Sequence, residues 1–457
     1  MASYKLDQAF TFRQGDEFET EDGQRYKVTG FLGRGGQGEV YRVTGADGEY
    51  ALKWYHTDRY LGRMGSRYAE AFYKNLKRNA ENGPPQLSSG DTATQFIWPL
   101  KMVRPQRGSF GYLMALFPEG YEQLRHVFLL RKKDGETGKI IPLAWKSWFV
   151  RITAALNIVR AFEILHKSGL SYQDLNAGGI SVDMENGSVM ICDCDNVSPD
   201  KSNLGIRGQM YYMAPEIVRG EKLPDRLTDQ YSLALILFRL LMQGHHPLNG
   251  LESKRLHNSE SISKEEVDLR IFGTQPHYCL AGGDNPNPLD IEANRDVYQL
   301  YYLYPRALMD AFERVFTEGI FEPQKRLTAT EWRRVLLDVR DHLVQVNGEE
   351  KFFDPRREKP LPPACRTMCY PLGRRVLCMP GKILYKYHLD EYGADYKEPV
   401  AKVIPTNQPG IIGLYNRTGQ PIRYGLGGQE AVCPDQGRMP LLRGMVVSFG
   451  QATISIE

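Results

Sequence analysis

The chain has 457 residues, of which 42% are hydrophobic and 25% are charged, and its formal net charge is +3 at pH 7. This composition is typical of a folded protein and excludes global disorder. The small net charge argues against nucleic acid as a main partner. At about 150 residues per domain, the length predicts two or three domains.

Targeting and redox features predict a cytoplasmic protein without a membrane segment. The best apolar stretch, 231–242, is short and contains Arg239, so we expect a buried helix there. The first residues lack the apolar segment of a signal peptide. The seven scattered cysteines, an odd number, suit a reducing compartment better than a disulfide framework.

Residues 1–119 are predicted to form a small β-rich lobe. Short β-branched and aromatic runs, broken by Gly and Asp, predict three strands between Arg25 and Tyr55. A glycine-rich turn joins the first two. We expect a helix over 63–82, and two further strands over 96–103 and 111–117.

Residues 120–346 are predicted to be mainly helical. Apolar residues recur every three or four positions from Trp148 to Phe162, as on one face of a helix. Asn186-Gly187 lies between two short apolar runs and predicts a β-hairpin. Further helices are expected over 229–243, 308–316 and 328–344.

The end of the chain is predicted to be a linker followed by an all-β domain. The charged, proline-rich stretch 347–363 predicts the linker. Over 364–457, seven short apolar runs separated by turns predict a sandwich or a barrel. Residues 441–450 resemble the end of a forkhead-associated-like sandwich, but we find no residue set with which such domains hold phosphothreonine. We therefore expect a structural or partner-binding domain.

A glycine turn, a lysine and two acids are spaced as nucleotide chemistry requires. The turn contains four glycines: Gly33, Gly35, Gly36 and Gly38. Glycines let backbone N–H groups approach phosphates without a Cβ in the way. Lys53 follows and can neutralise phosphate charge, while Asp174 and Asp193 can hold Mg²⁺ or accept a hydroxyl proton.

In chain order, these segments resemble the eukaryotic-like protein kinase superfamily over about residues 25–345, in a divergent, bacterial-type form. The matching segments are Leu32–Val40, Ala51–Lys53, Tyr172–Leu175, Asp193–Asp195, Met213–Glu216, Asp229–Leu233 and Arg326. The resemblance implies an α+β, bilobal protein-kinase-like fold. A small β-rich N-lobe (1–119) would precede a helical C-lobe (120–346), the linker (347–363) and the all-β sandwich (364–457).

The resemblance also implies ATP and Mg²⁺ as ligands. Lys53 would hold the α- and β-phosphates, Asp174 would accept the substrate hydroxyl proton, and Asp193 would chelate Mg²⁺. Glu70 is the best-spaced acid to orient Lys53, with Glu81 as its competitor. The residues expected around ATP are Leu32, Gly33, Gly35, Gly36, Gly38, Val40, Ala51, Lys53, Glu70, Met114 and Leu116.

Several positions depart from the kinase pattern. Gly179 stands where the family has a metal-binding asparagine, and Asn176 stands where serine/threonine kinases have a catalytic lysine. Asn176 lies in the same loop as Gly179 and could reach the second Mg²⁺ in place of the missing asparagine. Asp195 replaces a glycine and puts a second acid beside Asp193, which either binds the metal too or points into solvent. Losing one preorganised contact costs on the order of 3 kcal/mol, so activity would be weak.

The leading hypothesis is therefore an ATP-dependent protein kinase that acts, weakly, on Ser/Thr hydroxyls of a protein substrate. The alternative is a pseudokinase scaffold whose β-domain binds a partner protein. Gly179, Asn176 and Gln173 favour this alternative, Gln173 because it replaces the arginine that pairs with a phosphorylated activation segment. Transfer to a small molecule fits less well, because Glu216 and Arg326 match a protein-substrate platform.

Overall fold

The structure is a computed structural model that describes residues 10–56, 65–135, 137–203, 205–353, 364–390 and 392–457. The chain divides into two compact units that interleave along the sequence. The first contains Met1–Ala144, Asn157–Asp290 and Glu313–Ala329, and the second contains Trp145–Leu156, Ile291–Phe312 and Thr330–Glu457. The sequence did not predict this interleaving. Within the described ranges, no helix is long and apolar enough to span a bilayer.

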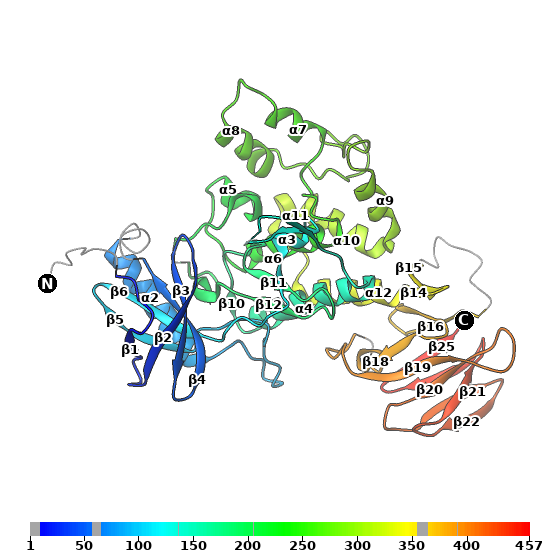
Figure 1. Ribbon diagram of the computed structural model, residues 1–457. Helices are drawn as coiled ribbons and strands as arrows, with labels where there is room; N and C mark the ends of the chain where they lie inside the picture. Colours follow the sequence, from blue (N-terminus) through cyan, green and yellow to red (C-terminus); the bar gives the residue numbers. More distant parts are fainter. Residues whose placement is uncertain (1–9, 57–64, 136, 204, 354–363, 391) are drawn as a thin grey trace. The chain divides into compact units, whose positions relative to one another are not determined.

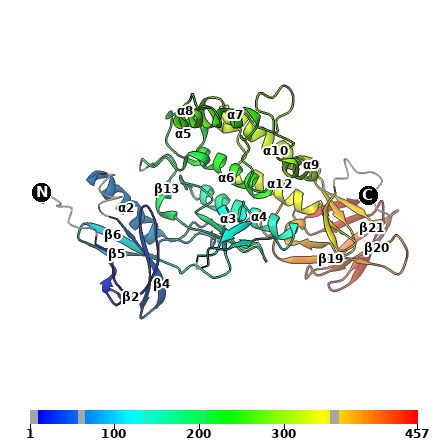
Figure 2. The same ribbon diagram turned by 45° about the horizontal axis from the view of Figure 1, so that its top comes forward.

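An antiparallel six-stranded sheet opens the first unit, in the order β1-β2-β3-β4-β6-β5 (Figure 1). Its strands are β1 (Glu17–Glu19), β2 (Arg25–Arg34), β3 (Gly38–Gly45), β4 (Gly48–Tyr55), β5 (Lys101–Gln106) and β6 (Ser109–Met114). The three strands predicted over residues 25–55 are confirmed. Helix α2 (Ser66–Asn82) lies beside the sheet in Figures 1 and 2. It buries Phe72 and Leu76 against Tyr55 and Tyr112 of the sheet.

The strand predicted over 96–103 is partly wrong, because β5 begins only at Lys101. The preceding residues cross to other elements instead of extending the strand. Phe96 forms an isolated bridge with Ile191, and the Trp98 indole N–H donates to the Asn79 carbonyl oxygen at 2.8 Å. Long-range contacts therefore decide the conformation of this apolar segment, and local propensity does not.

Two apolar helices form the centre of the helical part, α4 (Trp148–Lys167) and α6 (Arg226–Leu241). Asp225 starts α6 because its carboxylate accepts from the N–H groups of Leu227 and Thr228. The hairpin predicted at Asn186-Gly187 is confirmed as β11 (Ile180–Val182) and β12 (Val189–Ile191).

The remaining elements of this part are short strands and further helices. The strands are β7 (Glu122–Gln123), β8 (Arg131–Lys133), β9 (Ile140–Pro142), β10 (Leu170–Ser171) and β13 (Ser198–Pro199). The other helices are α3 (Leu124–Val127), α5 (Pro215–Val218), α7 (Leu251–His257), α8 (Lys264–Leu269), α9 (Arg295–Leu303), α10 (Arg306–Phe316), α11 (Glu318–Phe321) and α12 (Ala329–Asp341).

A β-hairpin replaces both the end of the predicted last helix and the start of the predicted linker. Helix α12 stops at Asp341, and β14 (Leu343–Val346) pairs with β15 (Glu349–Phe352). Asn347 and Gly348 form the turn with φ of 53° and 85°, the combination that a tight type I′ hairpin needs. Residues 354–363 of the predicted linker lie outside the described residues.

The C-terminal strands form two sheets around a shared core (Figure 1). One has the order β17-β16-β25-β24-β21-β22 and the other β18-β19-β20-β23. Their bounds are β16 (Arg366–Cys369), β17 (Arg375–Cys378), β18 (Ile383–Tyr385), β19 (Pro399–Pro405), β20 (Ile412–Asn416), β21 (Ile422–Leu426), β22 (Gln429–Cys433), β23 (Arg438–Leu441), β24 (Val446–Phe449) and β25 (Ala452–Ile456). Met368 and Ile454 from the first sheet pack with Val403 and Leu414 from the second. The likeness to forkhead-associated domains stays a prediction.

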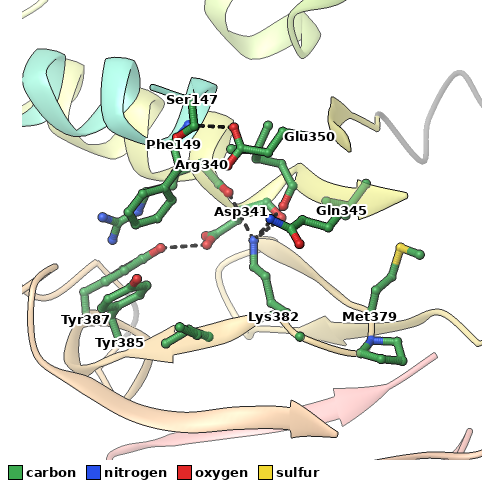
Figure 3. A pocket seen from close by; sticks show the side chains of 15 residues that line it. Ser147, Phe149, Arg340, Asp341, Gln345, Glu350, Met379, Lys382, Tyr385 and Tyr387 are labelled. Carbon is green, nitrogen blue, oxygen red and sulfur yellow. Dashed lines mark hydrogen bonds between the residues drawn. The ribbon is translucent and has the colours of Figure 1, made fainter. Parts of the chain in front are cut away.

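Buried polar groups join α12 to these strands within the second unit. Asp341, at the end of α12, accepts from Arg374 Nε at 3.1 Å, Tyr387 Oη at 2.6 Å and His388 Nε2 at 3.0 Å. Burial opposes ionisation, but Arg374 and His388 hold the pKa of Asp341 well below its usual range. Lys382 donates to the Arg340, Asp341 and Leu343 carbonyl oxygens at 3.0–3.2 Å (Figure 3). It thereby satisfies carbonyls that a helix end leaves without partners.

A cavity of about 280 Å³ lies beside this network (Figure 3). Phe149 and Tyr385 contribute aromatic walls, and the charged groups that line it are Arg340, Asp341, Lys382 and Glu350. Three of them have protein partners, since Lys382 caps α12, Asp341 accepts from Arg374, and Glu350 accepts from the Phe149 N–H at 3.2 Å. These three groups therefore stabilise the second unit, whereas Nε and Nη2 of Arg340 are buried without a hydrogen-bond partner among the described residues.

A buried ion pair joins two distant segments of the first unit. Arg326 is 1% exposed and donates to both carboxylate oxygens of Glu216 at 2.8 Å each. Arg326 also donates to the carbonyl oxygens of Gly319 and Leu227. Because every bond is made in a buried site, removing one partner leaves an uncompensated charge.

We predict that Glu216→Ala lowers the free energy of unfolding by about 3–5 kcal/mol, because the Arg326 charge stays buried without its partner. Equilibrium chemical denaturation measures the change. The control is Glu221→Ala, which breaks the exposed pair with Arg219 and should leave stability unchanged. Equal stability of the two variants would contradict the structural importance of the buried pair.

Candidate active site

The glycine turn and strand β4 place the predicted ATP-contacting residues on neighbouring strands. Val40 pairs with Lys53, and Ala51 pairs with Met114. Gly38 is required by close packing, since a Cβ there would overlap the Trp54 carbonyl oxygen. Gly33 and Gly36, in contrast, have open space in front of them, where a Cβ would meet no atom within 4 Å. This space suits a phosphate that approaches the backbone.

The two leucines of the predicted set lie at the edges of this surface. Leu32 is 47% exposed near the glycine turn, and Leu116 is half-buried just after β6. Gly35 closes the turn, because its N–H donates to the Gly38 carbonyl oxygen at 2.8 Å.

Lys53 is a buried cation with three acceptors. Its Nζ donates to Asp195 Oδ2 at 2.7 Å, to Asp193 Oδ1 at 3.0 Å and to Gln37 Oε1 at 3.0 Å. Burial opposes the charge, but the carboxylates of Asp195 and Asp193 raise the pKa of Lys53 well above its usual value. The lysine therefore stays protonated at the point where the glycine turn and the two acids meet.

Glu70 does not orient Lys53, so this prediction is wrong. The Glu70 carboxylate is exposed on α2 and accepts from Lys74 at 2.6 Å, one helical turn away. Glu70 lies at a suitable distance from Lys53 along the sequence, but its side chain is on the solvent-facing side of α2.

Asp229 holds the loop that carries Asp174. Its carboxylate is buried and accepts from the Tyr172 N–H at 2.6 Å and the Gln173 N–H at 2.9 Å. Gln173 has a φ of 74°, a left-handed conformation that costs energy for a residue with a side chain. The Asp229 hydrogen bonds stabilise this turn and so position Asp174.

Asp174 is half-buried in an acidic environment. Burial and the nearby Asp193 and Asp195 raise the pKa of its carboxyl group from 3.8 to about 7. A group with a pKa near 7 can exchange a proton near neutral pH, which is the property of a general base.

Asn176 supports the Asp174 loop. Its Nδ2 donates to the Asp174 carbonyl oxygen at 2.9 Å, and its Oδ1 accepts from the Gly178 N–H at 2.9 Å. Both ends of the amide are therefore bonded to the loop backbone, and the Nδ2 also approaches Asp174 Oδ1 at 3.5 Å.

Tyr172 explains the glycine at position 179. The Tyr172 hydroxyl donates to the Cys192 carbonyl oxygen. A Cβ at Gly179 would lie 3.2 Å from that hydroxyl oxygen, closer than side chains normally pack. A side chain at 179 would therefore crowd the Tyr172 hydroxyl from its Cβ onward, so the residues at positions 172 and 179 are sterically linked.

Asp193 is the carboxylate best placed for a magnesium ion. It directly follows the β-hairpin in a left-handed conformation (φ 56°), and its side chain is 56% exposed. No group of three or more His, Cys, Asp or Glu side chains in the described ranges could hold a metal alone. Mg²⁺ is commonly held by one or two carboxylates together with substrate phosphates and water, and Asp193 fits this kind of site.

The sequence analysis did not identify four residues around Lys53 as site residues. Gln37 and Tyr112 face Lys53 from the glycine turn and β6, and Tyr55 donates to Asp195 Oδ2 at 2.6 Å. Asn75 donates from α2 to the Asp195 and Val197 carbonyl oxygens. The two-residue period of β4 puts Tyr55 on the face of Lys53, and Asn75 interrupts the apolar stripe of α2. Both signals were available in the sequence.

Comparisons with known proteins find sequence similarity to protein kinases. The family model described as "Protein kinase domain" matches residues 147–332. Among curated proteins, the chain is 26% identical over 266 residues to the serine/threonine-protein kinase AtPK2/AtPK19 of Arabidopsis thaliana, covering 56% of this chain and 49% of that protein. It is 34% identical over 131 residues to the mouse ribosomal protein S6 kinase alpha-4, covering 28% of this chain and 16% of that protein. The chain thus spans about half, or less, of the relatives it matches.

Two solved structures are similar over most of their length. The Mycobacterium tuberculosis PknI kinase domain is 16% identical and aligns with a TM-score of 0.45 over 72% of this chain and 100% of that one. Vaccinia related kinase 3 is 15% identical, with a TM-score of 0.47 over 72% of this chain and 93% of that one. Residues 147–332 are thus similar to protein kinase domains, and this match does not reach the glycine turn or Lys53.

Proposed function

We propose that the protein is an ATP-dependent protein kinase that phosphorylates Ser/Thr hydroxyl groups of another protein. The observation that carries the proposal is the convergence of Lys53, Asp193 and Asp174 around the open glycine turn. The pairing of Glu216 with Arg326 and the Asp229 hydrogen bonds support a protein-substrate platform beside this site.

Each of these side chains has a separate part in the reaction. The Lys53 ammonium would neutralise phosphate oxygens of ATP, and the open side of the glycine turn at Gly33 and Gly36 would receive them. Asp174 accepts the proton of the attacking hydroxyl. Asp193 would hold Mg²⁺, which supplies positive charge to the transferring phosphate when bound.

The neutral side-chain amide of Gln173 contacts the activation segment, which is residues 193–216. Gln173 Nε2 donates to Ser198 Oγ at 2.6 Å and to the Ser202 carbonyl oxygen at 2.8 Å. Asn203 Nδ2 donates to Gln173 Oε1 at 2.8 Å. A neutral amide network therefore does here what an arginine–phosphate pair does in kinases activated by phosphorylation. We propose that the segment is ordered without that modification.

A pseudokinase scaffold is the second candidate, and Gly179 is the observation that favours it. Position 179 cannot supply a metal ligand, and the Tyr172 hydroxyl fills the adjacent space. The retained Lys53, Asp174 and Asp193 favour the enzyme, because a missing contact slows phosphoryl transfer without removing the reacting groups.

Binding and transfer of labelled ATP test the proposal. We predict that Mg·ATP at a hundred times its Kd stabilises the first unit by about 2.7 kcal/mol, seen as an upward shift in thermal unfolding.

The variant Asp174→Asn should keep this thermal shift but lower kcat for γ-phosphate transfer by roughly 10²–10⁴-fold, because the general base is lost. Asp296→Asn, an exposed acid on α9, is the matched control. Binding without any transfer by the wild type would establish the pseudokinase.

The pH profile gives an independent prediction. Because the protonated carboxyl of Asp174 cannot accept a proton, kcat/KM should fall about tenfold for each pH unit below the pKa of Asp174. Without metal this pKa is about 7, and Mg²⁺ held by Asp193 would lower it, because the ion offsets the negative charge that raises it. A rate that stays constant down to the pH of acid unfolding would exclude Asp174 as the base.

The raised pKa of the metal-free site also means that the folded state binds this proton more tightly than the unfolded state. The stability contribution of Asp174 therefore decreases as pH rises from 3.8 to about 7, which denaturation at several pH values measures.

The dependence of Gly179 on Tyr172 predicts a rescue. Gly179→Asn alone should not raise kcat, because the Tyr172 hydroxyl occupies the space next to the new side chain. Tyr172→His combined with Gly179→Asn frees that space and should raise kcat for phosphate transfer on the order of tenfold. Steady-state kinetics of the two single variants and the double variant measure this. An increase in the Gly179→Asn single variant would refute the steric explanation.

A further inference from the structure

Helix α2 presents no acid to Lys53. Its sequence contains two acids, Glu70 and Glu81, and both lie exposed. The buried face of the helix carries Phe72, Asn75 and Leu76 instead. An ammonium group that must be held toward phosphates needs a carboxylate partner, so this partner has to come from another element.

Asp195 has the geometry of that partner. Its side chain is 0% exposed, and its Oδ2 accepts from Lys53 Nζ at 2.7 Å and from Tyr55 Oη at 2.6 Å. Tyr55 lies two residues after Lys53 on β4, so both donors reach Asp195 from the same strand face. Asp195 Oδ1 is buried without a hydrogen-bond partner among the described residues. This carboxylate depends on the Lys53 charge, because an ionised group in such a site needs an opposite charge.

The backbone around Asp195 is held separately by α2. Asp195 lies in a short 3₁₀ helix, η2 (Cys194–Asn196). Asn75 Nδ2 donates to the Val197 carbonyl oxygen at 2.9 Å and to that of Asp195 at 3.3 Å, and Asn79 Nδ2 donates to Val197 at 2.8 Å. Helix α2 therefore supports the backbone that carries Asp195. Asp195 itself lies two residues after Asp193.

We propose that Asp195 is the positioning residue for Lys53, in place of an acid on α2, and that it is not a metal ligand. The proposal rests on the kinase function proposed above and assigns different parts to the two acids. Asp195, fully buried, holds the lysine, and Asp193, 56% exposed, is left to hold Mg²⁺. The carboxylate that orients Lys53 then comes from the turn after β12 and not from an acid on α2.

The test compares Asp195→Asn with Asp193→Asn in the full chain, using calorimetry of ATP binding with Mg²⁺ or with EDTA. In Asp195→Asn, the gain in ATP affinity from Mg²⁺ should stay within about threefold of the wild-type gain, a difference under 1 kcal/mol. In Asp193→Asn, the gain should disappear. Loss of the Mg²⁺ gain in Asp195→Asn would overturn the proposal and make Asp195 a metal ligand. No binding of Mg·ATP by the wild type would instead reject the proposed function itself.

A double-mutant cycle supplies the second readout. Asp195→Asn should lower kcat on the order of a hundredfold in the wild-type background, with little change in the KM for ATP. In a Lys53→Met background the same change should have no further effect, because Asp195 acts through the lysine. Additive losses would overturn the proposal, as would a hundredfold loss in Glu70→Gln, the acid on α2. Wild type and Asp195→Asn are compared by thermal unfolding, so that a folding defect is recognised.

Discussion

The buried Lys53 ammonium is the group on which the rest of the site depends. It is held among two carboxylates and an amide in a place that water hardly reaches. A charge in such a place is tolerated only if its partners are present, and the same is true of the Asp195 carboxylate. The glycine turn, β4 and the turn after β12 must therefore meet with little freedom. This meeting creates the surface on which we propose that ATP binds.

A second set of buried ionic groups holds together the segments that surround the site. Asp229 holds the backbone before Asp174, and Glu216 pairs with Arg326. None of these three groups is expected to touch ATP. Asp229 accepts from the backbone N–H of Gln173, whose left-handed conformation is unfavourable. Strain in this loop is thus offset by hydrogen bonds to the Asp229 carboxylate on α6.

The departures from the kinase pattern become consistent when they are taken in pairs. The glycine at 179 accompanies a tyrosine at 172 whose hydroxyl would lie 3.2 Å from a Cβ at 179. Gln173 stands where kinases have a phosphate-binding arginine, and it forms a neutral hydrogen-bond network with the activation segment. We propose that Asp195 compensates for an α2 without a buried acid. Each change is thus matched by a contact elsewhere, which supports an altered working site over a decaying one.

The sequence by itself determined the strands over residues 25–55 and the hairpin at Asn186-Gly187, because these depend on local patterns of glycines and alternating apolar residues. It also showed the segments that resemble protein kinases in their order along the chain. It also identified Lys53, Asp174 and Asp193 as candidates. Only the tertiary structure decided which acid meets Lys53. Asp195 is 142 residues away along the chain, whereas Glu70 is close in sequence but faces solvent. Spacing along a chain limits which residues can share an element, but burial and contact between distant elements arise only when the whole unit packs.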